Sequence, residues 1–336
     1  MGFKESIFEK ARANKQRIAI PECDNVTMLK AATRAHREDI ADIIFVGDKD
    51  KVAEIAGNEG VDISGISFYD IKDEAYQEEI VEKYFTLPGV IMSRKSITKR
   101  MSQPLYRALV MEAVGDCDCT FAGIDATTFE VVMAATGIIG LAEGVATASC
   151  FFATELKEFE GKKNFFIGMS DGGVSVEPTA EQLAGIAIAS CETYEAFKGE
   201  PARCAMLSYS TLGSGAGTAV DRVKEAVAIA NERRPDLYID GEFQADAALS
   251  KRVAEKKVKR ESQVAGQANV LIFPEIAACN IGSKLVQLTA DCNTFGPILQ
   301  GFRLPVCDCS RSDTEERILS NIACSSVLAT AKARKA

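Results

Sequence analysis

The alternation of short apolar runs with longer amphipathic stretches is the feature that most constrains how this sequence folds. The short runs are rich in Ile, Val and Phe and are bounded by Gly, Pro or Asp, whereas the longer stretches have the spacing of an amphipathic helix. We predict strands at residues 17–21, 43–47, 66–69, 119–123, 164–169, 204–209, 238–241 and 270–274. Strands that alternate with helices are typical of an α/β fold with mainly parallel sheets covered by helices.

Helices are predicted between these strands and at the end of the chain. One begins near Asn25, and others cover residues 103–114, 180–197 and 313–335. Thr179 and Gln182 form a capping-box pattern, because their side chains can bind free N–H groups at the start of the helix 180–197.

The length of 336 residues is about twice that of a typical domain, which predicts two domains or one large α/β unit. A candidate boundary lies at residues 141–144, between an apolar run that ends at Gly140 and the next amphipathic stretch. The segment after Phe302 ends in the last predicted helix, which is able to return to the first domain.

Charge and residue content exclude several classes of function. The 39 Lys and Arg and the 48 Asp and Glu give a net charge of −9, which disfavours nucleic acid and anionic membranes as partners. The sequence has neither an apolar run of about 18 residues for a membrane span nor a signal-peptide segment at its start, so we expect a cytoplasmic protein. In that compartment the 11 cysteines are interpreted as reduced and mostly buried thiols.

The single histidine, His36, limits the chemistry further. A zinc site rich in histidine is excluded, and a Ser-His or Cys-His pair would have to use this residue, which we predict to be exposed near a helix end. The pairs Cys117/Cys119 and Cys307/Cys309 do not have the spacing of a structural zinc site. We therefore expect neither a metal site nor a catalytic role for His36.

A loop of small residues joins the predicted strand 204–209 to an amphipathic helix. It contains Ser208, Ser210, Thr211 and Ser214, with glycines at 213, 215 and 217. Backbone N–H groups at a helix N-terminus favour an anion, hydroxyls add donors, and glycines allow a ligand to approach closely. The spacing is that of neither a Walker loop nor a dinucleotide-binding loop. Two interpretations stay open, an anion site or a glycine-rich turn without a ligand.

Ser310 and Arg311 follow a strand-like run at 296–302 and precede the last predicted helix. The hydroxyl can donate to an oxyanion, and the guanidinium has a planar pair of donors that matches phosphate or a polarised carbonyl. The alternative is a helix cap beside a surface charge. Three acidic residues that follow are candidate bases, although capping the helix and stabilising its dipole is the simpler role: Asp313, Glu315 and Glu316.

Six segments of the chain resemble the phosphate acetyltransferase / phosphate butyryltransferase family. They are IAIPECDNVTMLKAA (18–32), PTAEQLAGIAIAS (178–190), AMLSYSTLGSGAG (205–217), IDGEFQADAAL (239–249), ANVLIFPEIAACNIGSKLVQ (268–287) and FGPILQGFRLPVCDCSR (295–311). Because they occur in the family's order over nearly the whole chain, the likeness is more specific than any single motif.

The resemblance implies two α/β/α domains with mainly parallel sheets, in the isocitrate/isopropylmalate dehydrogenase-like architecture with a cleft between them. Residues 1–142 and 301–336 would form the first domain and residues 143–300 the second. It also implies a homodimer with no metal and no cofactor, in which CoA and phosphate are substrates. The reaction is acyl-CoA + phosphate ⇌ acyl phosphate + CoA, which depends on orientation and on stabilising an oxyanion rather than on a histidine or a covalent nucleophile.

The resemblance also implies roles for particular residues. Ser310 would bind the thioester or the CoA sulfur, and Arg311 would hold phosphate and the developing negative charge. The residues implied in binding substrate or CoA are Ser208, Ser210, Thr211, Gly213, Ser214, Asn280 and Lys284. The basic run 251–259 is either a solvated helix end or a contact for the phosphates of CoA.

Several positions depart from the family pattern. Where the family has an Asp as thiol base, this chain has Arg317, so Glu315 or Glu316 is the candidate base instead. Met133 occupies the position of a substrate-binding Arg. A side chain shifted by one residue along a helix is turned by about 100°, so a neighbour does not simply replace the residue it adjoins.

Two functions stay open after these departures. The first is a phosphate acyltransferase for acetyl or another short acyl group, and the apolar residues around Met133 favour a chain other than acetyl. The second is a non-catalytic or regulatory member of the family that binds CoA, acyl phosphate or a protein partner. A metal- and nicotinamide-dependent dehydrogenase of related architecture is disfavoured, because no acidic cluster accompanies a dinucleotide-binding loop.

Overall fold

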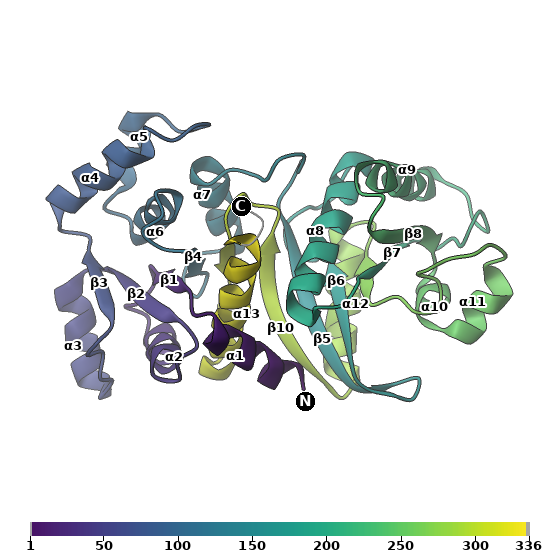
Figure 1. The fold of residues 1–336 in the computed structure, drawn as a ribbon, viewed down its shortest axis with the longest axis horizontal. Helices are drawn as coiled ribbons and strands as arrows, with labels where there is room; N and C mark the ends of the chain where they lie inside the picture. Colours follow the sequence, from purple (N-terminus) through teal and green to yellow (C-terminus); the bar gives the residue numbers. More distant parts are fainter. Residues whose placement is uncertain (1, 334–336) are drawn as a thin grey trace. The chain divides into compact units, whose positions relative to one another are not determined.

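The computed structural model describes residues 2–333 of the chain, and it divides into two compact units (Figure 1). Unit 1 combines the residues up to Ala142 with those from Phe302 onward, and unit 2 is Glu143–Gly301. Each unit has its own sheet with helices packed on it, so the α/β class with mainly parallel strands is confirmed.

The sheet of unit 1 is wholly parallel, in the strand order β11-β4-β1-β2-β3. Its strands are β1 (Arg17–Ile20), β2 (Asp42–Gly47), β3 (Ser67–Asp70), β4 (Cys119–Ala122) and β11 (Val306–Asp308). Because the chain moves outward from β1 in one direction and from β4 in the other, the order reverses between these two central strands. Ligands of open α/β sheets bind beyond the carboxyl ends of the strands at such a point.

Helices on both sides complete unit 1: α1 (Phe3–Ala13), α2 (Val26–Arg37), α3 (Lys49–Glu59), α4 (Glu74–Tyr84), α5 (Arg94–Arg100), α6 (Pro104–Ala113), α7 (Thr128–Ile138) and α13 (Glu315–Ala333). The last helix packs against α1 and α2, so the first and last helices of the chain lie side by side in this unit (Figure 1). Helix α2 begins next to Asn25, as predicted, and the Asn25 side chain caps it by accepting from the N–H groups of Thr27 and Met28.

The sheet of unit 2 is mixed, in the order β10-β5-β6-β9-β7-β8. Its strands are β5 (Ser149–Phe159), β6 (Lys162–Ser170), β7 (Arg203–Leu207), β8 (Tyr238–Phe243), β9 (Val270–Ile272) and β10 (Cys292–Gln300). The first three strands in this order pair antiparallel, whereas β6, β9, β7 and β8 pair parallel. The loops after these four parallel strands therefore emerge at one edge.

Five helices belong to unit 2: α8 (Ala180–Lys198), α9 (Thr218–Arg233), α10 (Ala245–Leu249), α11 (Lys251–Lys257) and α12 (Ile276–Thr289). Helix α8 begins with the predicted capping box, in which Thr179 and Gln182 each bind the other's backbone N–H. Ten of the 11 cysteines are buried and all are free thiols, as the composition indicated.

The eight predicted strands are present, but the prediction was wrong in several places. It omitted β5 and β11, and it placed a strand at 296–302 where β10 covers Cys292–Gln300. The last helix begins at Glu315 rather than at 313, and residues 334 and 335 of its predicted range lie outside the described residues. His36 is half-buried rather than exposed, because Gly65 of the α3–β3 connection passes close to its ring. Among residues 2–333, no helix is both long and apolar enough to cross a membrane.

Candidate functional site

The turn that carries Ser310 and Arg311 directly follows β11, at the carboxyl edge of the parallel sheet of unit 1. The Asp313 N–H donates to the Ser310 carbonyl oxygen at 2.8 Å, and the Asp313 carboxylate accepts from the Ser310 N–H at 3.0 Å. The side-chain oxygens of Ser310 and Ser312 lie 3.0 Å apart. These bonds fix the backbone on either side of the Ser310 hydroxyl.

Arg311 is exposed at the tip of this turn. Within residues 2–333 no carboxylate lies within ion-pair distance of its guanidinium, in contrast to Arg317, whose Nε lies 2.8 Å from Asp313 Oδ1. Hydrogen bonds from Thr127 are the main cause that holds the pKa of Glu130, at the start of α7, below its usual value. The positive charge of Arg311 is close enough to lower this pKa further. A guanidinium without a partner is free to bind an anion from solution.

Asp308, the last residue of β11, is fully buried beneath this turn. The Thr128 hydroxyl donates to its Oδ2 at 2.6 Å, and Oδ1 has no hydrogen-bond partner among the described residues. Burial raises the pKa of Asp308 to about 7, and the negative charges of Glu22 and Asp313 act in the same direction. At neutral pH the Asp308 carboxyl, two residues before Ser310, is therefore about half protonated.

Glu22 binds the loop after β4 at the point where the strand order reverses. Its carboxylate accepts from the N–H groups of Ile124, Asp125 and Ala126, at 2.8, 3.3 and 2.7 Å. Burial raises the pKa of Glu22, and these hydrogen bonds oppose that effect. A nest of backbone donors that would suit an anionic ligand is thus filled by a side chain of the protein itself.

The candidate bases are engaged in ion pairs. Glu316 binds both Lys4 and Arg34, and the hydrogen bond from Arg34 lowers its pKa, which makes it a weaker base. Glu315 lies 3.7 Å from the same Arg34 guanidinium. Arg317, which the resemblance compares with an Asp, is held by Asp313 one helical turn earlier, so the carboxylate nearest Ser310 is that of Asp313.

The glycine-rich loop of unit 2 follows β7 and leads into α9. The Ser210 hydroxyl and the Gly213 N–H both donate to Glu242 Oε1, at 2.7 and 2.8 Å. Burial opposes ionisation of Glu242, but these two hydrogen bonds hold its pKa below the usual value. Two donors predicted to face an anionic ligand are therefore satisfied by an internal carboxylate.

The remaining predicted residues of unit 2 differ in exposure. Thr211 is buried and bonds with Gln244, whereas Ser208 is half-buried and Ser214 is exposed. The oxygens of Ser208 and Ser214 accept from the N–H groups of Ser210 and Thr211. On α12 Asn280 donates to the Gly172 carbonyl oxygen at 3.2 Å, and Lys284 is exposed. The residues of this set are thus spread over two segments, and Ser310 and Arg311 belong to the other unit.

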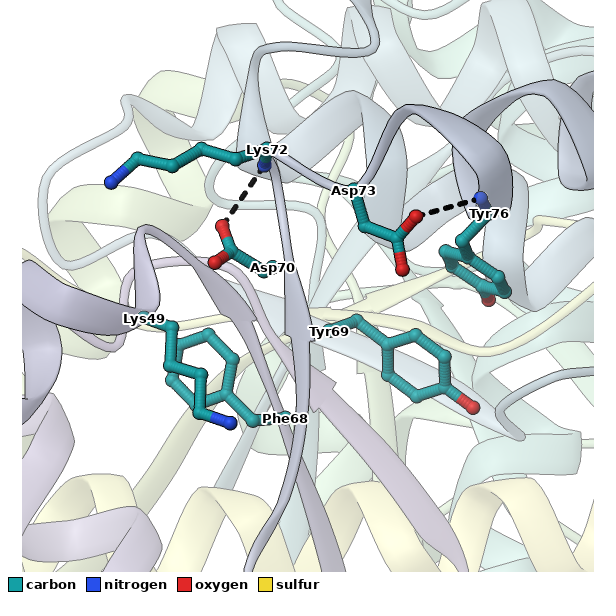
Figure 2. A pocket seen from close by; sticks show the side chains of 7 residues that line it. All are labelled: Lys49, Phe68, Tyr69, Asp70, Lys72, Asp73 and Tyr76. Carbon is teal, nitrogen blue, oxygen red and sulfur yellow. Dashed lines mark hydrogen bonds between the residues drawn. The ribbon is translucent and has the colours of Figure 1, made fainter.

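A pocket of about 510 Å³ lies at the carboxyl end of β3 (Figure 2). It is lined by Lys49, Phe68, Tyr69, Asp70, Lys72, Asp73 and Tyr76. The β3 and β11 strands are at opposite edges of the sheet of unit 1, so this pocket is separate from the Ser310 turn. The buried Arg107 fixes the loop that follows β3, because its guanidinium donates to the carbonyl oxygens of Asp70 and Ile71.

Among residues 2–333 no group of three or more His, Cys, Asp or Glu side chains could hold a metal ion. The sequence reasoning assigned no role to Glu22, Asp308 or Glu242. The signal for Glu22 and Asp308 was their place directly after or at the end of an apolar run, which in a parallel sheet is the carboxyl edge. Glu242 directly follows the predicted strand 238–241 and so had the same signal, although β8 extends to Phe243.

Comparison with known proteins gives a consistent result over the whole chain. Residues 2–326 match a family model described as "Phosphate acetyl/butaryl transferase". The phosphate acetyltransferase of Thermoanaerobacterium thermosaccharolyticum is 38% identical over 330 residues, which cover 98% of this chain and 100% of that protein. The phosphate acetyltransferase of Treponema pallidum is 36% identical over 342 residues, covering 99% of this chain and 100% of the relative.

Solved structures show the same similarity. The EutD phosphotransacetylase from Staphylococcus aureus has a TM-score of 0.88 at 29% identity, over 97% of this chain and 98% of that one. A phosphotransacetylase from Streptococcus pyogenes has a TM-score of 0.89 at 29% identity, over 98% of both chains. A 4-hydroxythreonine-4-phosphate dehydrogenase from Klebsiella pneumoniae, at 10% identity and a TM-score of 0.54 over 94% of this chain and 100% of that one, shares the fold alone.

Proposed function

Since the chain belongs to the phosphate acetyl/butyryl transferase family and is a phosphate acyltransferase, we propose that Ser310 and Arg311 bind the reacting groups of acyl-CoA and phosphate. The observation that carries the proposal is that the Arg311 guanidinium has no ion-pair partner within residues 2–333 and that Arg311 directly follows Ser310 on a turn fixed by Asp313. The two side chains leave the carboxyl edge of a parallel sheet, where ligands of such folds bind.

The reaction joins a phosphate oxygen to the thioester carbonyl carbon and breaks the bond from that carbon to sulfur. Arg311 holds the phosphate through two parallel N–H groups and offsets the charge that builds up on the carbonyl oxygen. Ser310 donates its hydroxyl proton as a hydrogen bond to the departing sulfur, which leaves as the CoA thiolate. Orientation of the two substrates supplies a large part of the rate, and no covalent intermediate is required.

A coupled assay of CoA release from acetyl-, propionyl- and butyryl-CoA with phosphate tests this proposal. We expect turnover of at least one thioester, and a loss of at least about tenfold in Arg311→Ala, which corresponds to about 1.4 kcal/mol in the barrier. Arg37→Ala is the matched control, because Arg37 is an exposed arginine at the carboxyl end of α2. Failure of all three thioesters to react, with calorimetric binding of CoA intact, would indicate a non-catalytic member of the family.

We extend the proposal to the conditions in which the enzyme acts. CoA and acyl phosphate are the ligands, and no metal or further cofactor is needed, because phosphate itself is the nucleophile. The hydroxyls of Ser208 and Ser214 and the Lys284 ammonium are the accessible groups of unit 2 that we assign to substrate. We place the enzyme in the cytoplasm with neither nucleic acid nor membrane as a partner, in line with its net charge of −9.

We also propose that the enzyme is a homodimer. Helix α12 exposes Ile281, Leu285 and Leu288 at the spacing i, i+4 and i+7, with exposed fractions of 60%, 56% and 83%. Apolar side chains at this spacing lie on one face of a helix, and such a face is typical of a protein–protein contact. Light scattering on the purified chain would give the mass of two copies, and a single-copy mass at micromolar concentration would exclude the dimer.

A further inference from the structure

Helix α7 turns large apolar side chains to solvent instead of burying them. Phe129 is 72% exposed and Met133 is 55% exposed, although Val131, Ala134 and Ala135 of the same helix are buried in unit 1. A surface helix normally places charged or polar residues at such positions. The exposed apolar face therefore indicates a binding surface for an apolar ligand or partner.

The apolar face continues along the whole helix. A Cβ atom at Gly137 would lie 3.0 Å from the Met92 sulfur, and one at Gly140 would lie 3.7 Å from Ile91 Cδ1, so these two side chains cover the far end of the same face. At 100° per residue, positions 129, 133 and 137 of α7 fall within about 80° of one another, and Gly140 lies just beyond the end of the helix at Ile138. We name Phe129, Met133, Met92 and Ile91 the α7 stripe.

The amino-terminal end of the α7 stripe lies beside the Ser310 turn. The Thr128 hydroxyl, one residue before Phe129, donates to Asp308 Oδ2 at 2.6 Å, and Asp308 is two residues before Ser310. Glu130, one residue after Phe129, is near enough to Arg311 to be influenced by its charge. All of these residues belong to unit 1. The stripe thus begins next to the residues that we propose to bind the thioester, and from position 129 to position 137 it leads away from them for about 12 Å at a rise of about 1.5 Å per residue.

We propose that Met133 and Phe129 form an acyl-chain subsite that gives this enzyme a preference for thioesters with an apolar chain longer than acetyl. The inference rests on the proposed function, because the thioester carbonyl must lie at Ser310 and Arg311 for its acyl chain to reach α7. An alkyl chain is the part of an acyl-CoA that matches an apolar surface. The phosphates and ribose of CoA are excluded from the α7 stripe by their polarity.

The preference follows from the apolar surface removed from water. Each methylene buried contributes about fourfold in binding, so two methylenes raise kcat/KM about 15-fold from acetyl- to butyryl-CoA. Apolar contact with the chain is made in the bound substrate as well as in the transition state. The effect is therefore expected mainly in KM, with kcat nearly constant.

The test compares acetyl-, propionyl- and butyryl-CoA in the wild type and in Met133→Gln. Glutamine has the length and the helix propensity of methionine but a polar end, so the fold of α7 is retained. We expect the ratio of kcat/KM for butyryl- to acetyl-CoA to fall from about 15 to about 4 or less. Met133→Leu should keep the wild-type ratio. Tyr238→Gln is the control, because it changes an exposed aromatic residue at the amino-terminal end of β8, away from the carboxyl edge.

Two results separate this inference from the proposed function. Turnover with acetyl-CoA as the best substrate and an unchanged ratio in Met133→Gln would overturn the acyl-chain subsite while the phosphate acyltransferase activity stands. Absence of turnover with every thioester would overturn the proposed function. In that case the affinities of the protein for butyryl- and acetyl-CoA, measured by calorimetry, test the acyl-chain subsite. Tighter binding of butyryl-CoA would support the subsite, and equal affinities would refute it.

Discussion

Replacement of Asp308 by Asn tests how much the buried carboxyl beneath the Ser310 turn lowers the free energy of unfolding. The asparagine has the same shape, and its Oδ1 atom can accept the hydrogen bond that the Thr128 hydroxyl gives to Oδ2 of the aspartate at 2.6 Å. What the change removes is the negative charge, which burial, Glu22 and Asp313 all disfavour. The difference between the two proteins therefore reports the ionisation of this one group.

The magnitude follows from the pKa of Asp308, which rises from 3.8 to about 7 on folding. Between these two values the folded protein binds more protons than the unfolded chain, so its free energy of unfolding falls as the pH rises. A shift of about 3 units corresponds to about 4 kcal/mol, lost between about pH 4 and about pH 7 and constant above that. Asp308→Asn lacks this loss, so its stability relative to the wild type increases by that amount over the same range.

Urea unfolding followed by circular dichroism at several pH values measures this difference, since the chain has no tryptophan to report by fluorescence. Other titrating groups contribute equally to both proteins and cancel when the two curves are subtracted. Hydrogen exchange of peptides from β4 and β11 assigns the effect to unit 1. A difference between the two proteins that stays constant from about pH 4 to about pH 8 would refute the raised pKa.

Two further substitutions test the packing and charge of the sites. Gly123→Ala should destabilise unit 1 by about 3 kcal/mol or more in urea unfolding, because φ is +102° there and the new Cβ would overlap the Asp308 carboxylate. The control Gly57→Ala, in open space on α3, should leave the stability unchanged or raise it slightly. Equal effects of the two substitutions would contradict this reasoning. Glu242→Gln should cost about 1 kcal/mol at neutral pH, because hydrogen bonds from Ser210 and Gly213 to a carboxylate become bonds to an amide. Since the pKa of Glu242 is lowered on folding, this cost should disappear as the pH falls below about 4, and a cost that persists in acid would argue against an ionised Glu242.

The sequence predicted those parts of the fold that depend on local pattern. Apolar runs of four to six residues identified the central parallel strands, and the capping box of Thr179 and Gln182 identified the start of α8. The β5 strand was missed because its burial does not alternate: seven residues from Ser149 onward are mostly buried, and its other end is exposed. The three-residue β11 is too short for a periodic signal, and only its pairing with β4 defines it as a strand.

The chemistry of the two sites depends on contacts that local pattern does not contain. Ser310 and Arg311 were identified as candidates from their own residue types, but Glu22, whose charge acts on Asp308 beneath them, comes from another strand. Glu22 follows β1 and binds the loop after β4, a contact across about a hundred residues of sequence. The glycine-rich loop of unit 2 has the composition of an anion site, and yet Glu242 from the neighbouring strand β8 takes two of its donors.

The exchange of charge on α13 shows how a departure from a family pattern is resolved by geometry. Arg317 replaces an expected carboxylate, but its guanidinium lies against Asp313, one turn earlier on the same face. That carboxylate also accepts from the Ser310 N–H, so a negative charge remains beside the turn although its position in the sequence has moved by four residues. Asp313 is buried and contacts both Arg317 and the Ser310 N–H, so under the proposed function we assign it to orienting Ser310. A reaction in which CoA leaves as the thiolate fits these residues, since such a step does not require a base near Ser310.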